Sequence, residues 1–208
     1  MAALKLYPEL KGRLKEIQDL EIPPARQQVL QPLIAYIQHK LDVGETAYLN
    51  FICTHNSRRS QFSQVWAQTA ADYYSLPVRC LSGGVEVTAC NERTVVSLER
   101  FGFRVSAKGT ENPKYGISHS ENCAPISAFS KLFDDPENNA ESFAAVMTCS
   151  HADENCPFIP GTEKRISVRY EDPKAFDDTP LEAEKYDERS IQIASEMFYV
   201  FSRLASTS

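Results

Sequence analysis

Residues 47–60, AYLNFICTHNSRRS, contain the pattern that decides the fold. Residues 47–52 form a short apolar run of the residue types that favour a β-strand, and this run stops abruptly at Cys53. A helical pattern then runs from about residue 60 to residue 74. A strand that passes through a short polar loop into a helix is typical of α/β folds, in which ligands bind beyond the carboxyl ends of the strands. The loop of residues 53–60 is therefore the first candidate site.

The same alternation of strands and helices continues toward the C-terminus. Residues 107–142 interrupt it, and their scattered Gly, Pro, Asn and Ser predict a long irregular excursion with a short hairpin near residues 115–120. The pattern predicts an α/β fold, a parallel sheet of about four strands with helices on both faces. Beyond the strand, loop and helix of residues 47–74, we predict strands at 78–81, 143–148 and 165–168, a turn at 82–84, and helices at 91–101 and 181–204.

The N-terminal residues 4–42 predict two helices, because apolar residues recur there every three or four positions and Pro23-Pro24 separates the two segments. No catalytic grouping is present among them. We divide the chain into an N-terminal helical extension, residues 1–45, and a catalytic domain, residues 46–208. The helices of the extension are predicted to form a hairpin that packs on the catalytic domain or on a second subunit, which would give a homodimer.

Composition and charge exclude some classes of function. The chain has 208 residues with 22 Lys and Arg against 28 Asp and Glu, a net charge of −6 that argues against nucleic acid as the main partner. No apolar run has the length of a membrane span, and the N-terminus lacks the pattern of a secretory signal, so we expect no membrane association. We expect a cytoplasmic protein whose six cysteines stay reduced and act as reactive thiols, metal ligands or core residues.

The candidate loop has the composition of an anion trap built around a nucleophile. Short turning backbone ahead of a helix directs N–H groups inward, and Arg59 can hold two oxygens of a tetrahedral oxyanion. The same positive field favours the thiolate form of Cys53. Ser60 can donate a hydrogen bond to the sulfur or cap the helix, and Asn56 tolerates left-handed backbone angles. The alternative is a buried cysteine beside a surface arginine.

A second pair of thiols, Cys149 and Cys156, follows the predicted strand at 143–148 and is separated by a polar segment. The two thiols could approach each other and form a relay, in which one attacks an adduct on the nucleophile and the other takes over the disulfide. Two alternatives stay open. Both thiols could be inert, or they could bind zinc with His151, although this spacing fits no common zinc arrangement. The remaining cysteines have no motif around them: Cys80, Cys90 and Cys123.

Two Asp-Pro pairs are candidates for a general acid that protonates a departing oxygen. Asp172 is the better placed of the two, because it follows the last predicted strand. Asp135 lies in the irregular excursion and is expected to shape a turn. A role in a turn is the alternative for Asp172 also.

These motifs resemble those of the low-molecular-weight tyrosine phosphatase superfamily, in which Cys-x5-Arg-Ser follows the first strand and the general acid is an Asp-Pro in a late loop. Within it, residues 53–61 and the pair of later cysteines are most similar to the thioredoxin-coupled arsenate reductases, and the resemblance covers about residues 47–204. His55 stands where the family usually has glycine, and Arg58 where it often has cysteine. The resemblance implies a substrate-binding loop made of Thr54, His55, Asn56, Ser57, Arg58 and Ser60.

The resemblance implies an arsenate reductase. Cys53 would attack arsenate, Arg59 would stabilise the charge, and Asp172 would protonate the leaving oxygen. Disulfides Cys53–Cys149 and then Cys149–Cys156 would follow, with electrons from thioredoxin and no metal or bound cofactor. A phosphatase that hydrolyses phosphate monoesters through a Cys53 phosphoenzyme would need neither later thiol, and a non-catalytic thiol sensor or anion-binding module is the third alternative.

Overall fold

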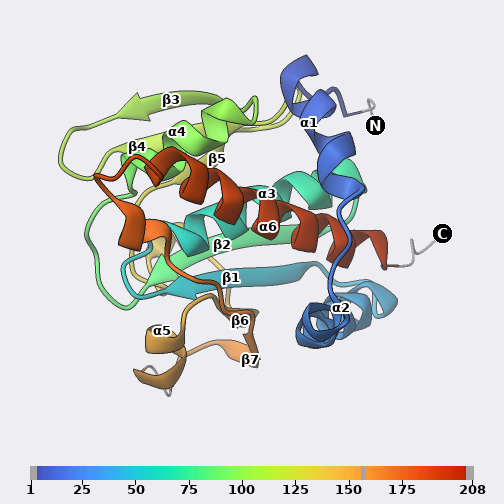
Figure 1. Cartoon of the computed structure of the whole chain (residues 1–208). Coiled ribbons are helices and arrows are strands. Elements are labelled where there is room, and N and C mark those ends of the chain that lie inside the picture. The colour runs from blue at the N-terminus through green and yellow to red at the C-terminus, as the bar shows by residue number, and fades with distance from the viewer. Residues whose placement is uncertain (1–3, 156–157, 205–208) are drawn as a thin grey trace.

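The computed structural model in Figure 1 describes residues 4–155 and 158–204 and contains a central parallel sheet. Its four strands lie in the order β2-β1-β6-β7, and each neighbouring pair is parallel. The predicted sheet of about four parallel strands is confirmed. The strands are β1 (Ala47–Cys53), β2 (Val78–Gly84), β6 (Phe143–Met147) and β7 (Thr162–Ser167).

The strand order places the ends of β1 and β6 side by side. The chain leaves β1 for β2 at one side of the sheet and returns to β6 at the other side, so the order reverses between β1 and β6. Ile52 pairs with Met147 at this point. Because a reversal of strand order opens a crevice at the carboxyl edge of the sheet, this is where a ligand site is expected.

The predicted turn at residues 82–84 is wrong, because these residues extend β2 and pair with the end of β1. The reason is close packing rather than chain reversal. A Cβ atom on Gly83 would lie 2.2 Å from the Cα atom of Phe133, and one on Gly84 would lie 2.8 Å from the backbone nitrogen of Asn56. The two glycines therefore let neighbouring backbone approach the sheet, and one of these neighbours belongs to the candidate loop.

The large helices share one hydrophobic core with one face of the sheet. Leu49, Phe51 and Val146 belong to this core, together with Trp66 of α3, whose indole N–H donates to Ser190 of α6. The opposite face carries a smaller core that is covered by the short α5 and by irregular segments. The helices are α3 (Arg59–Tyr73), α4 (Glu92–Arg100), α5 (Ser150–Asn155) and α6 (Glu182–Ser202).

The two helices predicted at the N-terminus are confirmed as α1 (Pro8–Gln18) and α2 (Pro24–Asp42). The predicted hairpin is wrong, because in the described part of the chain these helices pack against α6 rather than against each other. Both pack against α6, and their apolar side chains belong to the same core as those of the sheet (Figure 1). The extension is therefore integrated into the catalytic domain. None of the helices in the described ranges has the length and apolar character that a bilayer crossing requires.

Residues 104–128 form a second, antiparallel sheet where we predicted irregular chain with one hairpin near residues 115–120. Its order is β3-β4-β5, with β3 (Arg104–Lys108), β4 (Lys114–Ser118) and β5 (Ile126–Ala128). The hairpin thus joins β3 to β4 ahead of the predicted position. Most of β3 is exposed, so its sequence lacks the alternation of apolar and polar residues that marks a half-buried strand. Two short 3-10 helices complete the fold, η1 (Pro136–Asn138) and η2 (Pro173–Phe176).

Candidate active site

The loop between β1 and α3 holds the Cys53 thiol at its floor, with 4% of the residue exposed. The Cys53 Sγ atom lies 3.1 Å from Ser60 Oγ, and Asn56 Nδ2 donates to the same oxygen at 2.9 Å. Because the amide already donates to Ser60, the serine hydroxyl is left to donate to the sulfur. Asn56 has a φ of +47°, the left-handed conformation predicted for it. This chain of hydrogen bonds stabilises negative charge on Cys53.

The loop backbone is fixed from outside by residues that the sequence did not single out. Gln61 Nε2 donates to the carbonyl oxygen of Asn56 at 2.8 Å, and the backbone N–H of Lys131 donates to Asn56 Oδ1 at 3.2 Å. The backbone N–H groups of Val85 and Glu86 both donate to the carbonyl of Thr54 at 2.9 Å. The glycine pair at the end of β2 is the sequence signal for these contacts, since Gly84 lets the backbone of β2 approach that of the loop.

Outer contacts also hold the rest of the loop. Ser130 Oγ donates to the carbonyl of His55 at 2.7 Å, and Ser57 Oγ donates to the carbonyl of Ala89 at 2.7 Å. Burial lowers the pKa of the nearby Lys131 to about 8. The loop is therefore held in one conformation before any ligand arrives, as a preformed anion site requires.

Arg59 and Asp172, predicted as the anion clamp and the general acid, lie together. Arg59 Nη2 donates to Asp172 Oδ2 at 2.6 Å, and Nη1 donates to the carbonyl of Tyr170 at 3.2 Å. Asp172 also accepts from the backbone N–H of Lys174 at the start of η2. Of the two Asp-Pro pairs, the one with Asp172 lies beside Arg59, whereas Asp135 caps η1, as expected of a turn residue.

Arg58 is engaged away from the loop. Its Nε donates to the hydroxyl of Tyr186 at 2.7 Å, and its Nη2 donates to Asp177 Oδ2 at 3.2 Å. Tyr186 in turn donates to the same aspartate at 2.8 Å. Arg58 therefore ties the start of α3 to α6, a role that the sequence interpretation of it as a substrate ligand did not include.

A cavity of about 540 Å³ opens beside the loop. His55 is on its wall, and His55 Nε2 lies 3.2 Å from Glu86 Oε2. Cys90 also lines this cavity, and burial raises the pKa of its thiol to about 12. Cys90 is therefore protonated at neutral pH and does not compete with Cys53 as a nucleophile.

Cys149 lies against the loop, with 1% of its surface exposed. Its Sγ atom is 3.5 Å from Thr54 Oγ1, and the backbone N–H of Ala152 donates to the sulfur at 3.4 Å. His151 Nδ1 lies 3.2 Å from the same threonine hydroxyl. Among the described residues, Cys149 and His151 belong to no group of three possible metal ligands, while Cys156, the predicted third thiol, lies outside the described residues.

The segment that carries Cys149 is held by one carboxylate. Asp153 accepts hydrogen bonds from Arg165, Arg169 and Ser167. Burial alone would raise the pKa of Asp153, but these hydrogen bonds outweigh it and hold the pKa below its ordinary value.

Known proteins resemble this chain in sequence and in fold, although no family model does. An arsenate reductase of Staphylococcus aureus (strain Newman) is 31% identical over 124 residues, which are 59% of this chain and 76% of that protein. Arsenate reductase 2 of Staphylococcus epidermidis (strain RP62A) is 27% identical over the same shares.

Solved structures share the fold at lower identity. An arsenate reductase in the phosphate-binding state has a TM-score of 0.52 at 17% identity and covers 77% of this chain and all of its own. A low-molecular-weight phosphotyrosine phosphatase from Vibrio cholerae O395 has a TM-score of 0.51 at 11% identity, over 75% and 94% of the two chains. With nearly a third of the residues identical over three quarters of a relative, and with this fold, the chain belongs to the arsenate reductase family within the low-molecular-weight tyrosine phosphatase superfamily.

Proposed function

We propose that this protein reduces arsenate to arsenite with three thiols and draws its electrons from thioredoxin. The observation that carries the proposal is the buried Cys149 thiol, which lies 3.5 Å from the hydroxyl of Thr54, the residue next to the nucleophile. A phosphatase needs no second thiol at this place. The sequence relatives named arsenate reductases agree with the proposal.

The first step is a displacement at arsenic. The Cys53 thiolate attacks arsenate, a sulfur–arsenic bond forms, and one oxygen leaves as water after it is protonated. Arg59 and the loop N–H groups hold the remaining oxygens. An oxyanion bound at Arg59 competes with Asp172 for the guanidinium, which frees the Asp172 carboxyl group to face the leaving oxygen and donate the proton.

The second step is the reduction. The Cys149 thiolate attacks the sulfur of Cys53, so that a disulfide forms and the sulfur–arsenic bond breaks. The electron pair of that bond stays on arsenic, which leaves as arsenite. The contact of Ala152 N–H with Cys149 Sγ favours the thiolate needed for this attack.

The third step regenerates the nucleophile. The Cys156 thiolate attacks the sulfur of Cys149, releases the Cys53 thiolate, and leaves a Cys149–Cys156 disulfide that the dithiol of thioredoxin reduces. This scheme needs no bound cofactor. It needs a compartment that keeps thiols reduced, which places the protein in the cytoplasm. Self-association through the N-terminal helices is not required, because α6 covers their apolar faces.

The test couples arsenate reduction to oxidation of NADPH through thioredoxin and thioredoxin reductase. The native protein is expected to turn over many times, and Cys149→Ser is expected to stop after forming one adduct on Cys53. Cys80→Ser is the matched control, because Cys80 is a buried thiol on β2 outside the site. Equal multiple turnover by native protein and Cys149→Ser would eliminate the relay.

A second function, hydrolysis of phosphate monoesters, is favoured by the contact between Arg59 and Asp172. These two groups and Cys53 suffice to form and hydrolyse a phosphoenzyme. Hydrolysis of p-nitrophenyl phosphate that survives Cys149→Ser, with no NADPH oxidation by the native protein, would make the phosphatase the principal activity. The two activities can also coexist, because the loop recognises oxyanion shape more than the central atom.

A further inference from the structure

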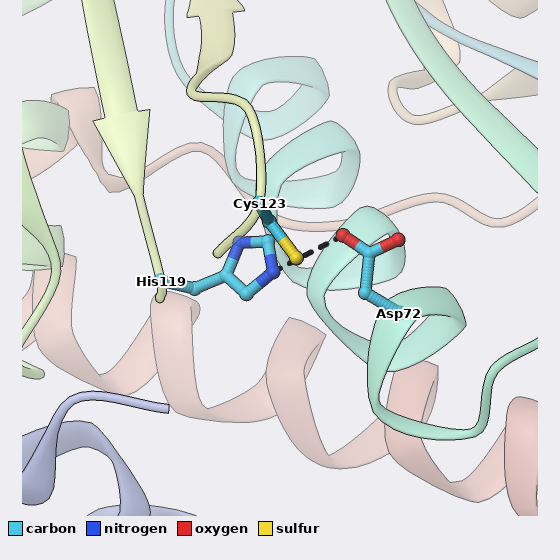
Figure 2. A group of neighbouring side chains, drawn as sticks. All are labelled: Asp72, His119 and Cys123. Atoms are coloured by element: carbon cyan, nitrogen blue, oxygen red, sulfur yellow. Dashed lines mark ion pairs between the residues drawn. The ribbon is translucent and has the colours of Figure 1, made fainter. Parts of the chain in front are cut away.

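Asp72, His119 and Cys123 come together at the far end of α3 from the active-site loop. Their ligand atoms all lie within 4.8 Å of one another. Figure 2 shows the imidazole, the thiol and the carboxylate directed toward a common point. Asp72 is in the last turn of α3, and the other two residues are in the connection between β4 and β5. The loop begins α3, so about 20 Å of helix separates the two places.

The imidazole of His119 has an unusual environment. The residue is 1% exposed, and neither ring nitrogen makes a hydrogen bond with any other described residue. Its Nε2 lies 3.1 Å from Asp72 Oδ2. Nε2 therefore has Asp72 as an ion-pair partner but makes no well-formed hydrogen bond with it, and Nδ1 has no hydrogen-bond partner among the described residues. Because buried polar atoms almost always have hydrogen bonds, an imidazole that faces a carboxylate and a thiol in this way fits a site for a shared ligand.

The surroundings suit a cation. Gln68 Nε2 donates to Asp72 Oδ1 at 3.0 Å, which orients the carboxylate and leaves Oδ2 toward His119. The last turn of α3 adds the negative end of a helix dipole. A cavity of about 360 Å³, lined by Asp72, Cys123 and Cys80 among others, gives an ion a path to the cluster.

We propose that this cluster binds a zinc-class divalent transition metal through Asp72 Oδ2, His119 Nε2 and Cys123 Sγ. Carboxylate, imidazole and thiolate are the ligand set of tetrahedral zinc, and the fourth position would face the cavity and take water. Ligand atoms around zinc lie about 3.5 Å apart. His119 Nε2 and Asp72 Oδ2 are already 3.1 Å apart and all the ligand atoms lie within 4.8 Å of one another, so binding needs changes of no more than about 1 Å in these separations. The Cys123 thiol releases its proton to solvent, and no electron is transferred.

The role of this metal is to join segments distant in sequence. It links α3 to the β4–β5 connection, which is already bound to the N-terminal extension. There, the backbone N–H of Tyr7 donates to the carbonyl of His119, and the Tyr7 hydroxyl donates to the carbonyl of Ser120, both at 3.1 Å. Metal binding is therefore expected to stabilise the fold rather than take part in the chemistry at Cys53.

The test titrates the reduced, chelator-treated full-length protein with Co²⁺, whose absorption reports thiolate ligation and tetrahedral geometry. We expect one equivalent to bind with a sulfur-to-cobalt charge-transfer band, and Zn²⁺ to displace it and raise the melting temperature. Cys123→Ser should abolish the band and weaken Zn²⁺ binding at least 10-fold. Asp72→Asn should weaken binding while keeping the band, and circular dichroism would verify that both variants fold.

Cys149→Ser is the matched control, because Cys149 is a buried thiol outside the cluster that also lies close to a histidine, His151, in the sequence. The cobalt band of this variant should equal that of the native protein. The proposal is wrong if no equivalent of Co²⁺ binds, if the band survives Cys123→Ser, or if the band disappears in Cys149→Ser. These outcomes do not depend on arsenate or phosphate-ester turnover.

Discussion

The two segments that meet at the carboxyl edge of the sheet are held in different ways. The loop around Cys53 is partly to fully buried, and its side chains and carbonyls are fixed by hydrogen bonds with α3, with the residues that follow β2 and with the segment at Ser130 and Lys131. The segment after Cys149 is a short helix, α5, that is held chiefly by the nearly buried carboxylate of Asp153 and by two partly exposed arginines. One thiol thus lies in a rigid frame, and the other lies beside a helix held by ion pairs.

This difference matches the movements that the proposed chemistry requires. A nucleophile that stabilises an oxyanion gains from a frame that does not reorganise. A thiol that must carry a disulfide away from the loop needs a segment that can open locally, and a short helix that is held mainly by one carboxylate can open when the contacts of that carboxylate break. The predictions below test the contrast by substituting equivalent residues in the two segments.

The largest effect is expected from Asn56→Ala. It removes the amide that orients Ser60 and leaves buried partners unsatisfied, which costs about 2–4 kcal/mol of folding free energy. It is also expected to lower kcat/KM at least about 100-fold for arsenate and for p-nitrophenyl phosphate. Asn155→Ala on α5 is the matched variant, because Asn155 is exposed and its side chain donates to the carbonyl of His151. For Asn155→Ala, urea unfolding should show a loss of less than about 0.5 kcal/mol in the free energy of unfolding. Steady-state kinetics should show only a small change in kcat/KM. Equal effects would remove the contrast between the segments.

The next largest effect is expected as a difference in kcat/KM between variants of the adjacent arginines Arg58 and Arg59. Arg59→Lys loses the planar fork at the oxyanion and is expected to lower kcat/KM about 100-fold with little loss of stability. Arg58→Lys loses contacts with Tyr186 and Asp177, so it is expected to cost about 1 kcal/mol in urea unfolding and to change kcat/KM less than about 10-fold. A larger decrease of kcat/KM in Arg58→Lys would indicate that Arg58 contacts the substrate.

Asp153→Asn should loosen α5 selectively. Hydrogen exchange in residues 150–155 is expected to accelerate about 10-fold, since the ion pairs with Arg165 and Arg169 are lost. Hydrolysis of p-nitrophenyl phosphate should stay within about twofold of native, because the loop contacts are intact. Faster exchange at residues 53–60 as well would show that the two segments form one cooperative unit.

The smallest effect is expected from pH, through the ion pairs that Asp153 makes with Arg165 and Arg169. Because the folded pKa of Asp153 lies below its ordinary value, its contribution to stability is complete above the ordinary pKa of about 4 and is lost as the pH falls through the folded value. Limited pepsin digestion between pH 5 and pH 3 should therefore open residues 149–155 increasingly with acid. Asp153→Asn should show this sensitivity already at pH 5, and an unchanged native pattern down to pH 3 would contradict the assignment.

The sequence predicted those parts of the structure whose cause is local. The strand before Cys53, the helix after it, the hydrogen bond between Ser60 and the sulfur, and the left-handed backbone of Asn56 all lie within one short stretch. The place of Asp172 followed from its position after the last strand. These features needed only residue types, their spacing and the edge of the sheet.

The parts that sequence analysis missed depend on contacts between distant segments. Gly83 and Gly84 read as a turn, whereas they extend a strand because Phe133 and the loop press against it. The exposed strand β3 had no apolar alternation to detect. His119 and Asp72 lie 47 positions apart in the sequence, so no motif could join them.

The position of α6 has a consequence for how the chain is made. Residues 182–202 contact α1, α2, α3 and α4, so α1 and α2, which leave the ribosome well before α6, wait for α6 before their apolar faces are covered. Until then, leucines such as Leu10, Leu30 and Leu33 stay accessible on the nascent chain. Because long-range closure is slow and exposed apolar surface promotes aggregation, productive synthesis should depend on chaperones that shield α1 and α2 until α6 has emerged.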